Sequence, residues 1–238
     1  MRNQSYYKNI KEFVQALNVS EIPYLVIRNF ENLYEKELYV DGHGDIDLLC
    51  ADSKALAKKV NAIPKEYHLK NGKEDGTHYY IYIDGKYCNL DLRSVGDGYY
   101  CQEWEKDLLK NRVLNNGFYV PAPKDYFYSL IYHSIFQKKE FSEDYRRRLK
   151  KMGQDLQINI EENKLGFYIR HLEMYMRENG YTYVYPNDKY VPFRKGLIQD
   201  KSLLVVDRSI QRKHCYFHSK LAFIGFLVGI KHRLFGKK

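Results

Sequence analysis

The segment Gly-Asp-Ile-Asp-Leu-Leu at 44–49 is the part of this sequence that most constrains its fold. Apolar residues alternate there with Asp45 and Asp47, and a period of two predicts a β-strand over 45–51. A strand with an apolar face must pack on a core, so both carboxylates project together from its other face. The fold must therefore hold two acidic side chains beside a hydrophobic core, where an ionised group needs compensation.

Further elements are expected on both sides of this strand. Helical spacing of apolar residues predicts helices over 5–17 and 52–62. Runs of β-branched and aromatic residues predict strands over 24–30, 77–84 and 86–94, the last two joined as a hairpin at Gly85. This order of elements predicts an α/β (α+β) fold with a mixed sheet and flanking helices.

The second half of the chain is expected to be mostly helical. Apolar periodicity predicts helices over 99–115, 124–141, 142–156 and 165–179. Gly117 and the proline-containing run 120–123 predict an extended linker between the halves. We therefore expect an N-terminal α/β domain of residues 1–118, a helical domain of residues 119–180, and an extended segment with a C-terminal tail, residues 181–238.

Net charge and cysteine content indicate the kind of binding partner and the cellular compartment of the protein. The 238 residues carry a net charge of +9, which predicts contact with an anionic molecule such as a nucleotide, nucleic acid or phospholipid headgroup. The four cysteines show no CxxC spacing, and the first residues contain no apolar signal segment. A cytoplasmic, reducing compartment is expected, with the cysteines as small core residues.

The C-terminal tail combines apolar and basic residues. Residues 221–230 are uncharged and apolar, and lysines and arginines flank them on both sides. Ten residues are too few to span a bilayer, which needs about 20. Two interpretations stay open: a core or partner-docking helix, or a peripheral membrane contact through 220–238 at the inner face of the membrane. Upstream, 182–193 is expected to be extended and 203–211 to be a strand or short turn.

A metal site is predicted from Asp45 and Asp47 together with Asp91 on a later strand. Residues i and i+2 of a strand project from the same face, so one divalent ion can reach both carboxylates. Mg²⁺, or alternatively Mn²⁺, prefers such oxygen ligands and usually takes one or two carboxylates plus substrate phosphates. A third acid on a neighbouring strand would complete a site for two ions, about 3.5–4 Å apart.

These residues resemble a known superfamily. A strand, a loop ending in glycine, an Asp-x-Asp strand and a later strand with a third Asp form the pattern of the DNA polymerase beta-like nucleotidyltransferases. More narrowly, YLVIRNFENL (24–33), HGDIDLLC (43–50) and NLDLRSVGDGYY (89–100) are similar to nucleotidyltransferase-like proteins associated with bacterial surface-polysaccharide synthesis. The resemblance covers residues 20–100 best and implies a nucleotidyltransferase-like mixed sheet.

The resemblance also implies roles for particular residues. Asp45 and Asp47 would ligate the ions that hold the nucleotide phosphates, and Asp91 would ligate the catalytic ion and help to deprotonate the acceptor hydroxyl. The sequence departs from the superfamily at Arg28-Asn29-Phe30, where a Gly-Ser pair is usual. Either Arg28 binds a phosphate directly through its bidentate fork, or the substrate is not a triphosphate.

The expected substrate-binding residues are Arg28, Asn29, His43, Gly44, Arg93 and His133. The alternative interpretation is that His43 is an exposed loop residue and His133 a packed helix residue, neither of which contacts substrate. The basic run 146–151 is either a solvated helix face or the lining of an acceptor groove. Asp97, between Gly96 and Gly98, is expected to be a turn residue.

The function expected from these features is metal-dependent transfer of a nucleotidyl or related phosphoryl group from a nucleoside triphosphate or other nucleotide donor. The acceptor would be a small or lipid-linked molecule, with surface-polysaccharide synthesis as the setting that the resemblance implies. The alternative is a non-catalytic nucleotide- or nucleic-acid-binding protein that keeps the fold, nucleic acid being the less favoured partner. A transferase that modifies a protein and thereby neutralises a toxin is a third hypothesis.

Overall fold

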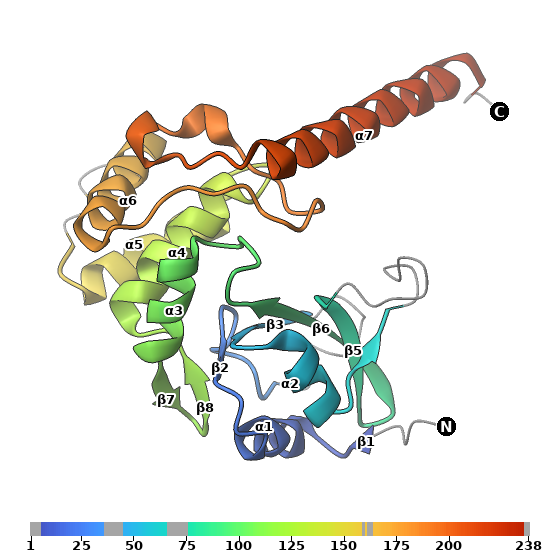
Figure 1. The fold of residues 1–238 in the computed structure, drawn as a ribbon, viewed down its shortest axis with the longest axis vertical. Coiled ribbons are helices and arrows are strands. Elements are labelled where there is room, and N and C mark those ends of the chain that lie inside the picture. Colours follow the sequence, from blue (N-terminus) through green and yellow to red (C-terminus); the bar gives the residue numbers. More distant parts are fainter. Residues whose placement is uncertain (1–5, 36–44, 66–75, 159, 161–163, 236–238) are drawn as a thin grey trace.

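The computed structural model describes residues 6–35, 45–65, 76–158, 160 and 164–235 (Figure 1). Its strands are β1 (Tyr6–Tyr7), β2 (Tyr24–Val26), β3 (Asp45–Cys50), β4 (Ile63–Pro64), β5 (His78–Ile83), β6 (Lys86–Ser94), β7 (Val113–Asn115) and β8 (Phe118–Val120). Its α-helices are α1 (Ile10–Val19), α2 (Ser53–Lys59), α3 (Gln102–Lys110), α4 (Pro123–Phe136), α5 (Glu143–Asp155), α6 (Leu165–Asn179) and α7 (Arg208–Phe235). The expected mixed α/β fold with a helical C-terminal part is confirmed.

The main sheet has the order β1-β5-β6-β3-β2, with β4 also paired to β5. The acid-bearing strand β3 runs parallel to β6 and antiparallel to β2. The predicted hairpin is confirmed, because β5 and β6 pair antiparallel around Gly85, whose φ of 71° suits a residue without a Cβ. This topology brings together two strands, β3 and β6, that are far apart in sequence.

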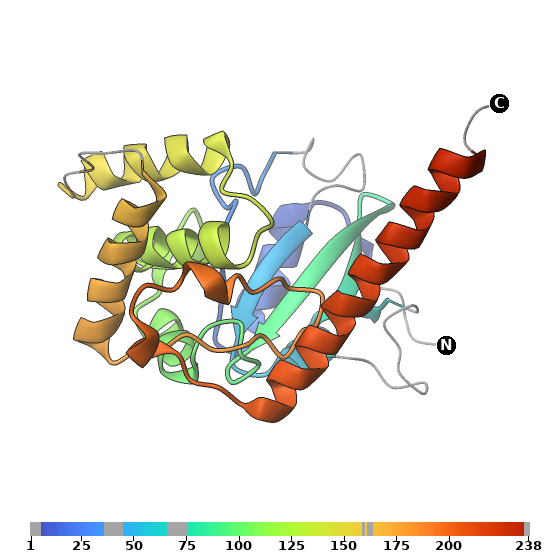
Figure 2. The ribbon, with the colours of Figure 1, turned by 90° about the horizontal axis from the view of Figure 1, so that it is seen from above.

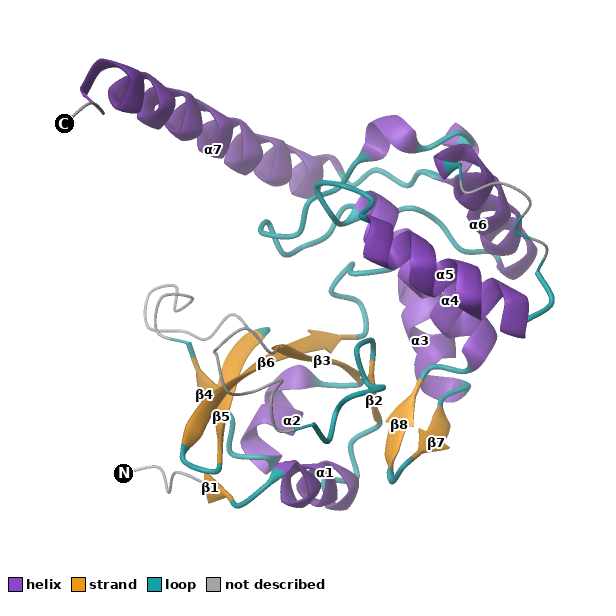
Figure 3. Cartoon of the chain, turned by 180° about the vertical axis from the view of Figure 1, so that it is seen from behind, coloured by secondary structure: helices purple, strands orange, loops and turns teal. Residues whose placement is uncertain are grey.

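The two faces of the central strands differ in chemistry. Ile46 and Leu48 on β3, with Leu90 and Leu92 on β6, are buried on the face that α1 and α2 cover (Figure 3). The other face carries the acidic residues and turns toward the helical part of the molecule. The alternation that predicted β3 thus places the two acids on one face, although Asp47 and Leu49 on that face are buried too.

The first helix begins later than its sequence pattern suggested. Asn9 is the N-cap of α1, and its side chain accepts a hydrogen bond from the Glu12 amide at 3.1 Å. The preceding Tyr6 and Tyr7 pair with β5 as a short parallel strand, so the expected helix over 5–17 is replaced by β1 and α1. The strand expected over 24–30 also ends earlier, at Val26.

The helical part packs around aromatic residues. The stretch 126–136 of α4 is buried throughout, and α4 contacts both α5 and α6. Trp104 of α3 stacks on Tyr181 with ring centroids 5.1 Å apart. Helix α6 ends at Gly180 in the left-handed conformation, as its sequence indicated.

The connection between the halves differs from the expectation. The helix expected over 99–115 is shorter, since α3 ends at Lys110. Residues 113–120 form the hairpin β7–β8 in place of the end of that helix and the start of the expected linker, because Asn116 and Gly117 adopt positive φ values of 48° and 89° that reverse the chain. The expected boundary at 118 falls on the first residue of β8. A single cluster of buried apolar residues includes members of both halves, and the proposed division into domains stays a prediction.

The last part of the chain is a long helix that projects from the body (Figure 2). Before it, 182–193 contains no regular helix, and Tyr183 forms an isolated bridge to Leu204. The region expected as a strand or turn over 203–211 divides between a 3₁₀ turn, Lys201–Leu203, and the start of α7. Within the described residues, no helix has both the length and the apolar character to cross a membrane.

Candidate functional site

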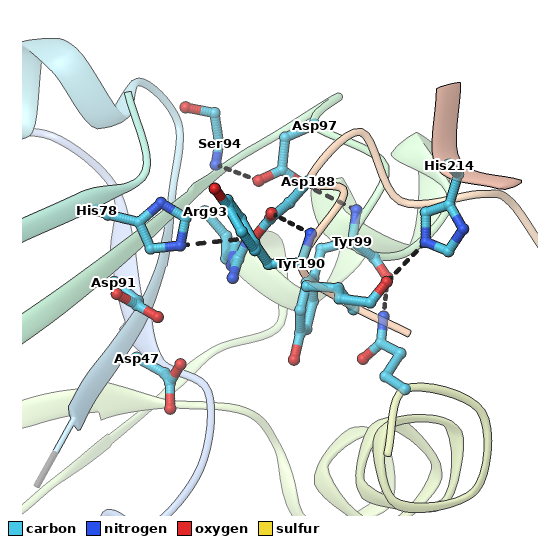
Figure 4. Close-up of polar contacts among 12 residues, drawn as sticks. Asp47, His78, Asp91, Arg93, Ser94, Asp97, Tyr99, Asp188, Tyr190 and His214 are labelled. Atoms are coloured by element: carbon cyan, nitrogen blue, oxygen red, sulfur yellow. Dashed lines mark hydrogen bonds and ion pairs between the residues drawn. The ribbon is translucent and has the colours of Figure 1, made fainter. Parts of the chain in front are cut away.

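Asp47 and Asp91 lie side by side on the polar face of the sheet (Figure 4). They are register partners on the parallel strands β3 and β6, so their side chains leave the sheet in the same direction. Asp47 is buried, with 5% of its surface exposed, and the Asp91 side chain is 17% exposed. Two carboxyl groups that sequence analysis placed in one site therefore meet at a solvent-poor position.

Cationic side chains converge on these two acids from several elements. Arg28, which follows β2, donates from Nη2 to Asp47 Oδ1 at 2.7 Å. Lys65, which follows β4, places Nζ 3.9 Å from Asp91 Oδ1. Burial lowers the pKa of Lys138, and Arg28 lowers it further, whereas Asp47 and Asp45 act in the opposite direction. The site is therefore a mixed-charge cluster and not a bare acidic patch.

Asp91 is the less compensated of the two acids. Burial raises the pKa of its carboxyl group above the usual value, and the charge of Asp47 raises it further. Among the described residues, Asp91 Oδ1 has no hydrogen-bond partner. A buried carboxylate in this position would be stabilised by an added cation.

Tyr99 connects Arg28 to the helical part of the protein. Its hydroxyl accepts from Arg28 Nη1 at 2.7 Å and lies 2.8 Å from His133 Nδ1 on α4. Gln137, one turn after His133, donates from Nε2 to the Tyr99 carbonyl oxygen at 2.6 Å. Burial raises the pKa of Tyr99 to about 12, so its hydroxyl stays protonated at neutral pH.

His133 lies behind Tyr99 and does not contact the carboxylates. Burial lowers the pKa of its ring well below the usual value, and the nearby Arg28 lowers it further. Nδ1 of the neutral imidazole lies within hydrogen-bond distance of two groups, the Tyr99 hydroxyl and Gln137 Oε1, the latter 3.2 Å away. The geometry makes His133 a support for Tyr99, and through it for Arg28.

A second chain of contacts crosses from the sheet to the 182–193 segment. Arg93 of β6 donates from Nη1 to Asp188 Oδ2 at 2.9 Å, and its guanidinium lies 4.7 Å from the centre of the Tyr99 ring. His78 of β5 places Nε2 3.6 Å from the same Asp188 oxygen. Since His78 is also the register partner of Asp91, this segment reaches the edge of the acidic pair (Figure 4).

The turn after β6 is held by two buried carboxyl groups. Asp97 accepts from the amides of Ser94 and Tyr99, and Glu105 of α3 accepts from the amides of Gly96 and Tyr100. Burial raises the pKa of Glu105 to about 9, and Asp97 contributes in the same direction. The expectation that Asp97 is a turn residue agrees with these contacts. These contacts also fix the position of Tyr99, whose amide donates to Asp97.

The 182–193 segment rests directly on this turn. A Cβ on Gly98, whose φ is 76°, would meet the Tyr185 carbonyl oxygen at 3.1 Å. The Asn187 amide donates to the Asp97 carbonyl oxygen at 3.2 Å. Glycine at this position therefore allows the backbone approach that brings Asp188 to Arg93.

Two cavities adjoin the cluster. One of about 480 Å³ is lined by Gln137, Lys138, Lys139, Glu140, Ser142, Tyr145 and Pro192. Its lining includes Gln137, which bonds Tyr99, and Lys138, whose charge interacts with Asp47. A smaller cavity of about 230 Å³ lies on the other side of the turn, lined by Asp52, Ser53, Lys54, Gly76, Thr77, Ser94 and Asp97. The first has the size of a small-molecule site and basic lining residues.

The expected site residues divide into three groups. Asp47, Asp91, Arg28, Arg93 and His133 lie in the cluster described above. Asp45 is exposed at the start of β3, and the exposed Asn29 accepts from Arg148 Nη1 of α5 at 3.0 Å. His43 and Gly44 fall outside the described residues.

No three His, Cys, Asp or Glu side chains converge as a metal-ligand set within the part of the chain that the structure describes. The three-carboxylate site therefore stays a prediction, and Asp47 with Asp91 is the pair that the fold brings together. Of the basic run expected on α5, Arg148 lies close enough to the sheet to bond Asn29 and, at 2.6 Å, the Tyr126 hydroxyl.

Several residues of the cluster were not anticipated. His78 was within reach of sequence reasoning, because counting back from the Gly85 turn places it opposite Asp91. Tyr99 and Gln137 carried no such signal, since neighbouring tyrosines and glutamines are equally plausible as surface residues. Asp188 comes from an irregular segment whose position only the tertiary fold determines.

Comparisons with known proteins assign no family. No protein-family model and no curated protein matches the chain. Among solved structures, the crystal structure of JHP933 from Helicobacter pylori aligns over 91% of this chain and 95% of that chain, with 12% sequence identity and a TM-score of 0.38. A likeness at this level shows neither a common family nor a function.

Proposed function

We propose that this chain is a metal-dependent nucleotidyltransferase whose acidic pair is Asp47 and Asp91. The observation that carries the proposal is the register of β3 and β6, which sets the buried Asp47 and the mostly buried Asp91 beside each other on one face of the sheet. The proposal draws its reaction class from the sequence resemblance and its site from this geometry.

The pair is chemically suited to Mg²⁺ or Mn²⁺. Mg²⁺ usually takes one or two carboxylates from the protein and the rest of its ligands from water and substrate phosphates, so two acids suffice. Asp91 Oδ1, which has no hydrogen-bond partner among the described residues, is the atom best suited to a cation. Asp47 is engaged by Arg28 at 2.7 Å, so metal binding would require that contact to loosen or to be shared.

In the proposed transfer, an acceptor hydroxyl oxygen bonds to the α-phosphorus of a nucleoside triphosphate and pyrophosphate leaves. The hydroxyl proton passes to an Asp91 carboxylate oxygen and from there to water. The bound metal would supply charge neutralisation for the phosphates.

Basic side chains around the pair are placed to bind the donor. Lys138 borders the larger cavity, and its charge interacts with the charges of Asp47 and Asp45, so it adds positive potential on the side where the donor phosphates would lie. Arg28 and Arg93 flank the Tyr99 ring, which fixes both guanidinium groups near the acids. In this proposal the base and sugar of the nucleotide occupy the larger cavity between α4, α5 and Pro192.

Ligand-dependent stabilisation tests the proposal directly. We expect one of the four nucleoside triphosphates to raise the melting temperature only when Mg²⁺ or Mn²⁺ is present, with a stabilisation of about 2.7 kcal/mol at a hundred times its Kd. Asp91→Asn should remove the effect. The variant keeps the shape of the side chain and loses no hydrogen bond at Oδ1 among the described residues, but it does lose the 3.9 Å ion pair with Lys65, so its melting temperature without ligand is the reference for its binding. Pyrophosphate release in the presence of candidate acceptors would then measure turnover.

Asp155→Asn is the matched control, since it removes an exposed carboxylate at the far end of α5. It should bind nucleotide and metal as the wild type does. If no nucleotide stabilises the wild type with either metal, or if Asp91→Asn retains full binding, the proposal is wrong.

A second function has one specific observation in its favour. The ion pair between Arg28 and Asp47 already neutralises one acid without a metal, which suits a binding protein that has kept the fold but not the reaction. Nucleotide binding that is unchanged by chelation of divalent metal, together with no pyrophosphate release, would favour this alternative.

A further inference from the structure

Residues 221–227 of α7, called outer α7 below, expose apolar side chains that pack on no other element in the described part of the protein. Leu221 is 48% exposed, Phe223 61%, Ile224 44%, Phe226 64% and Leu227 46%. They follow one another in a helix that extends away from the body (Figures 1 and 2). A contiguous apolar surface of this kind marks an interaction site.

The inner half of α7, by contrast, is attached to the body. His214 is buried and bonds the Val191 carbonyl oxygen through Nε2 at 2.7 Å. Phe217 packs against Tyr190 with ring centroids 5.1 Å apart, and Gln211 bonds the Tyr185 hydroxyl. These contacts attach the first turns of α7 to the body and fix the direction in which its exposed residues project.

The charge of the protein is concentrated in the same region. Eight of the 39 lysines and arginines, and none of the 30 aspartates and glutamates, lie within residues 208–238. The remaining chain has 31 basic and 30 acidic residues, so its net charge is only +1. The basic residues are Arg208, Arg212, Lys213, Lys220, Lys231, Arg233, Lys237 and Lys238.

We propose that α7 docks the protein on an anionic phospholipid surface, with residues 221–230 in the headgroup–acyl boundary. An apolar stretch bounded by lysines and arginines, without acids, is complementary to lipid that presents hydrocarbon beneath negative headgroups. At 1.5 Å per residue the stretch is about 15 Å long, about half the hydrocarbon thickness, so the helix lies in the interface. A second copy of α7 is a poorer occupant, since like charges on both helices repel.

The docking has a consequence for the candidate site. Tyr190, which contacts Phe217 of α7, also lies against His78, with ring centroids 6.2 Å apart. The same segment supplies Asp188 to Arg93. The anchor of α7 and the acidic pair are therefore joined through one short segment, and docking would hold the site at a fixed height above the lipid. This inference does not depend on the proposed transferase activity.

Vesicle binding of the full-length protein tests the proposal. We expect the protein to co-sediment with vesicles of phosphatidylcholine mixed with phosphatidylglycerol, and only weakly with phosphatidylcholine alone. High salt should reduce the binding, since part of it is electrostatic. Phe223→Ser with Phe226→Ser should weaken partitioning at least tenfold, because both side chains would leave the acyl boundary.

Charge and apolar contributions can be separated with matched variants. Arg212→Gln, Lys213→Gln and Lys220→Gln together should weaken binding to anionic vesicles on the order of 100-fold at low salt. Lys58→Gln, Lys150→Gln and Lys151→Gln remove three exposed charges elsewhere and should have little effect. Val19→Ser with Leu114→Ser is the control for the phenylalanines, since both residues are exposed on other elements.

Three results would overturn the proposal. One is a wild-type protein that binds neither kind of vesicle, and another is equal binding to neutral and anionic vesicles. The third is a wild-type protein that does not bind vesicles but forms a concentration-dependent dimer in light scattering, when the Phe223 and Phe226 substitutions abolish that dimer. The last outcome would assign the apolar surface to a second copy of the chain.

Discussion

The acidic pair and outer α7 depart from ordinary protein architecture in opposite ways. Around Asp47 and Asp91, charged side chains are mostly buried and are linked to one another by ion pairs of 2.7–3.9 Å. On outer α7, large apolar side chains face solvent. Burying charge and exposing apolar surface both cost free energy, so each region indicates a function that folding alone does not require.

The two regions also differ in how they depend on the rest of the fold. Each member of the charge cluster is held by a residue from another element, as Arg28 is by Tyr99 and Asp47. The apolar side chains from Leu221 to Leu227 are exposed, and the contacts of α7 with the body that the structure describes come from its first turns. Substitutions should therefore destabilise the protein strongly in the cluster and hardly at all on outer α7.

The largest effect is expected for Asp47→Ala. Removing this acid leaves the buried Arg28 guanidinium without its anionic partner, and breaking a buried ion pair in this way costs about 3–5 kcal/mol. Urea denaturation of wild type and variant would measure the loss of unfolding free energy. A loss below about 1 kcal/mol, the range of surface pairs, would mean that Arg28 is solvated and the cluster is open.

A smaller loss is expected for Tyr99→Phe. The substitution removes the hydroxyl that bonds Arg28 and His133 and leaves two buried polar groups with one partner fewer, which costs about 1–3 kcal/mol. Tyr87→Phe is the control, because the Tyr87 side chain is largely exposed on β6. Equal stabilities of the two variants in urea would show that Tyr99 does not hold the cluster together.

The turn beneath the cluster should make stability depend on pH. The pKa of Glu105 is raised to about 9 in the folded protein, from an unfolded value near 4.5. A group with a raised folded pKa contributes stability that is complete below the unfolded value and is lost as pH rises through the folded one. The wild type should therefore lose stability between about pH 5 and pH 9.

Glu105→Gln provides the comparison for this pH dependence. The amide is neutral at every pH, so the variant should show a flatter stability curve over the same interval, whatever its absolute stability. Thermal unfolding across this interval would measure both curves. Parallel curves for wild type and variant would assign the pH dependence to another group.

The smallest effect is expected on outer α7. Phe223→Ser with Phe226→Ser should change the unfolding free energy by no more than about 0.5 kcal/mol, because both side chains are exposed and neither packs against another element in the described part of the protein. Urea denaturation without lipid would measure it. A loss of several kcal/mol would show that these residues pack in solution, and the contrast between the two regions would disappear.

Local sequence patterns predicted the elements that depend on local physics. The alternation in 45–50, the turn at Gly85 and the helix end at Gly180 each follow from one residue's preference or a short period, and each is present. Predictions failed where tertiary pairing decided the outcome. Tyr6 and Tyr7 have helical spacing with later residues but pair with β5, and 113–120 turns back on itself as a hairpin.

The shared face of Asp45 and Asp47 was predictable because strand periodicity orients side chains before any tertiary contact is known. The sequence determined that Asp45 and Asp47 share a face and that Asp91 lies on a nearby strand. It also determined the charge and the apolar run of α7. The tertiary structure decided that Asp91 aligns with Asp47, that Tyr99 and Asp188 reach Arg28 and Arg93, and that outer α7 stays uncovered. Those outcomes depend on strand register and on packing between segments up to 95 residues apart, which local preferences do not specify.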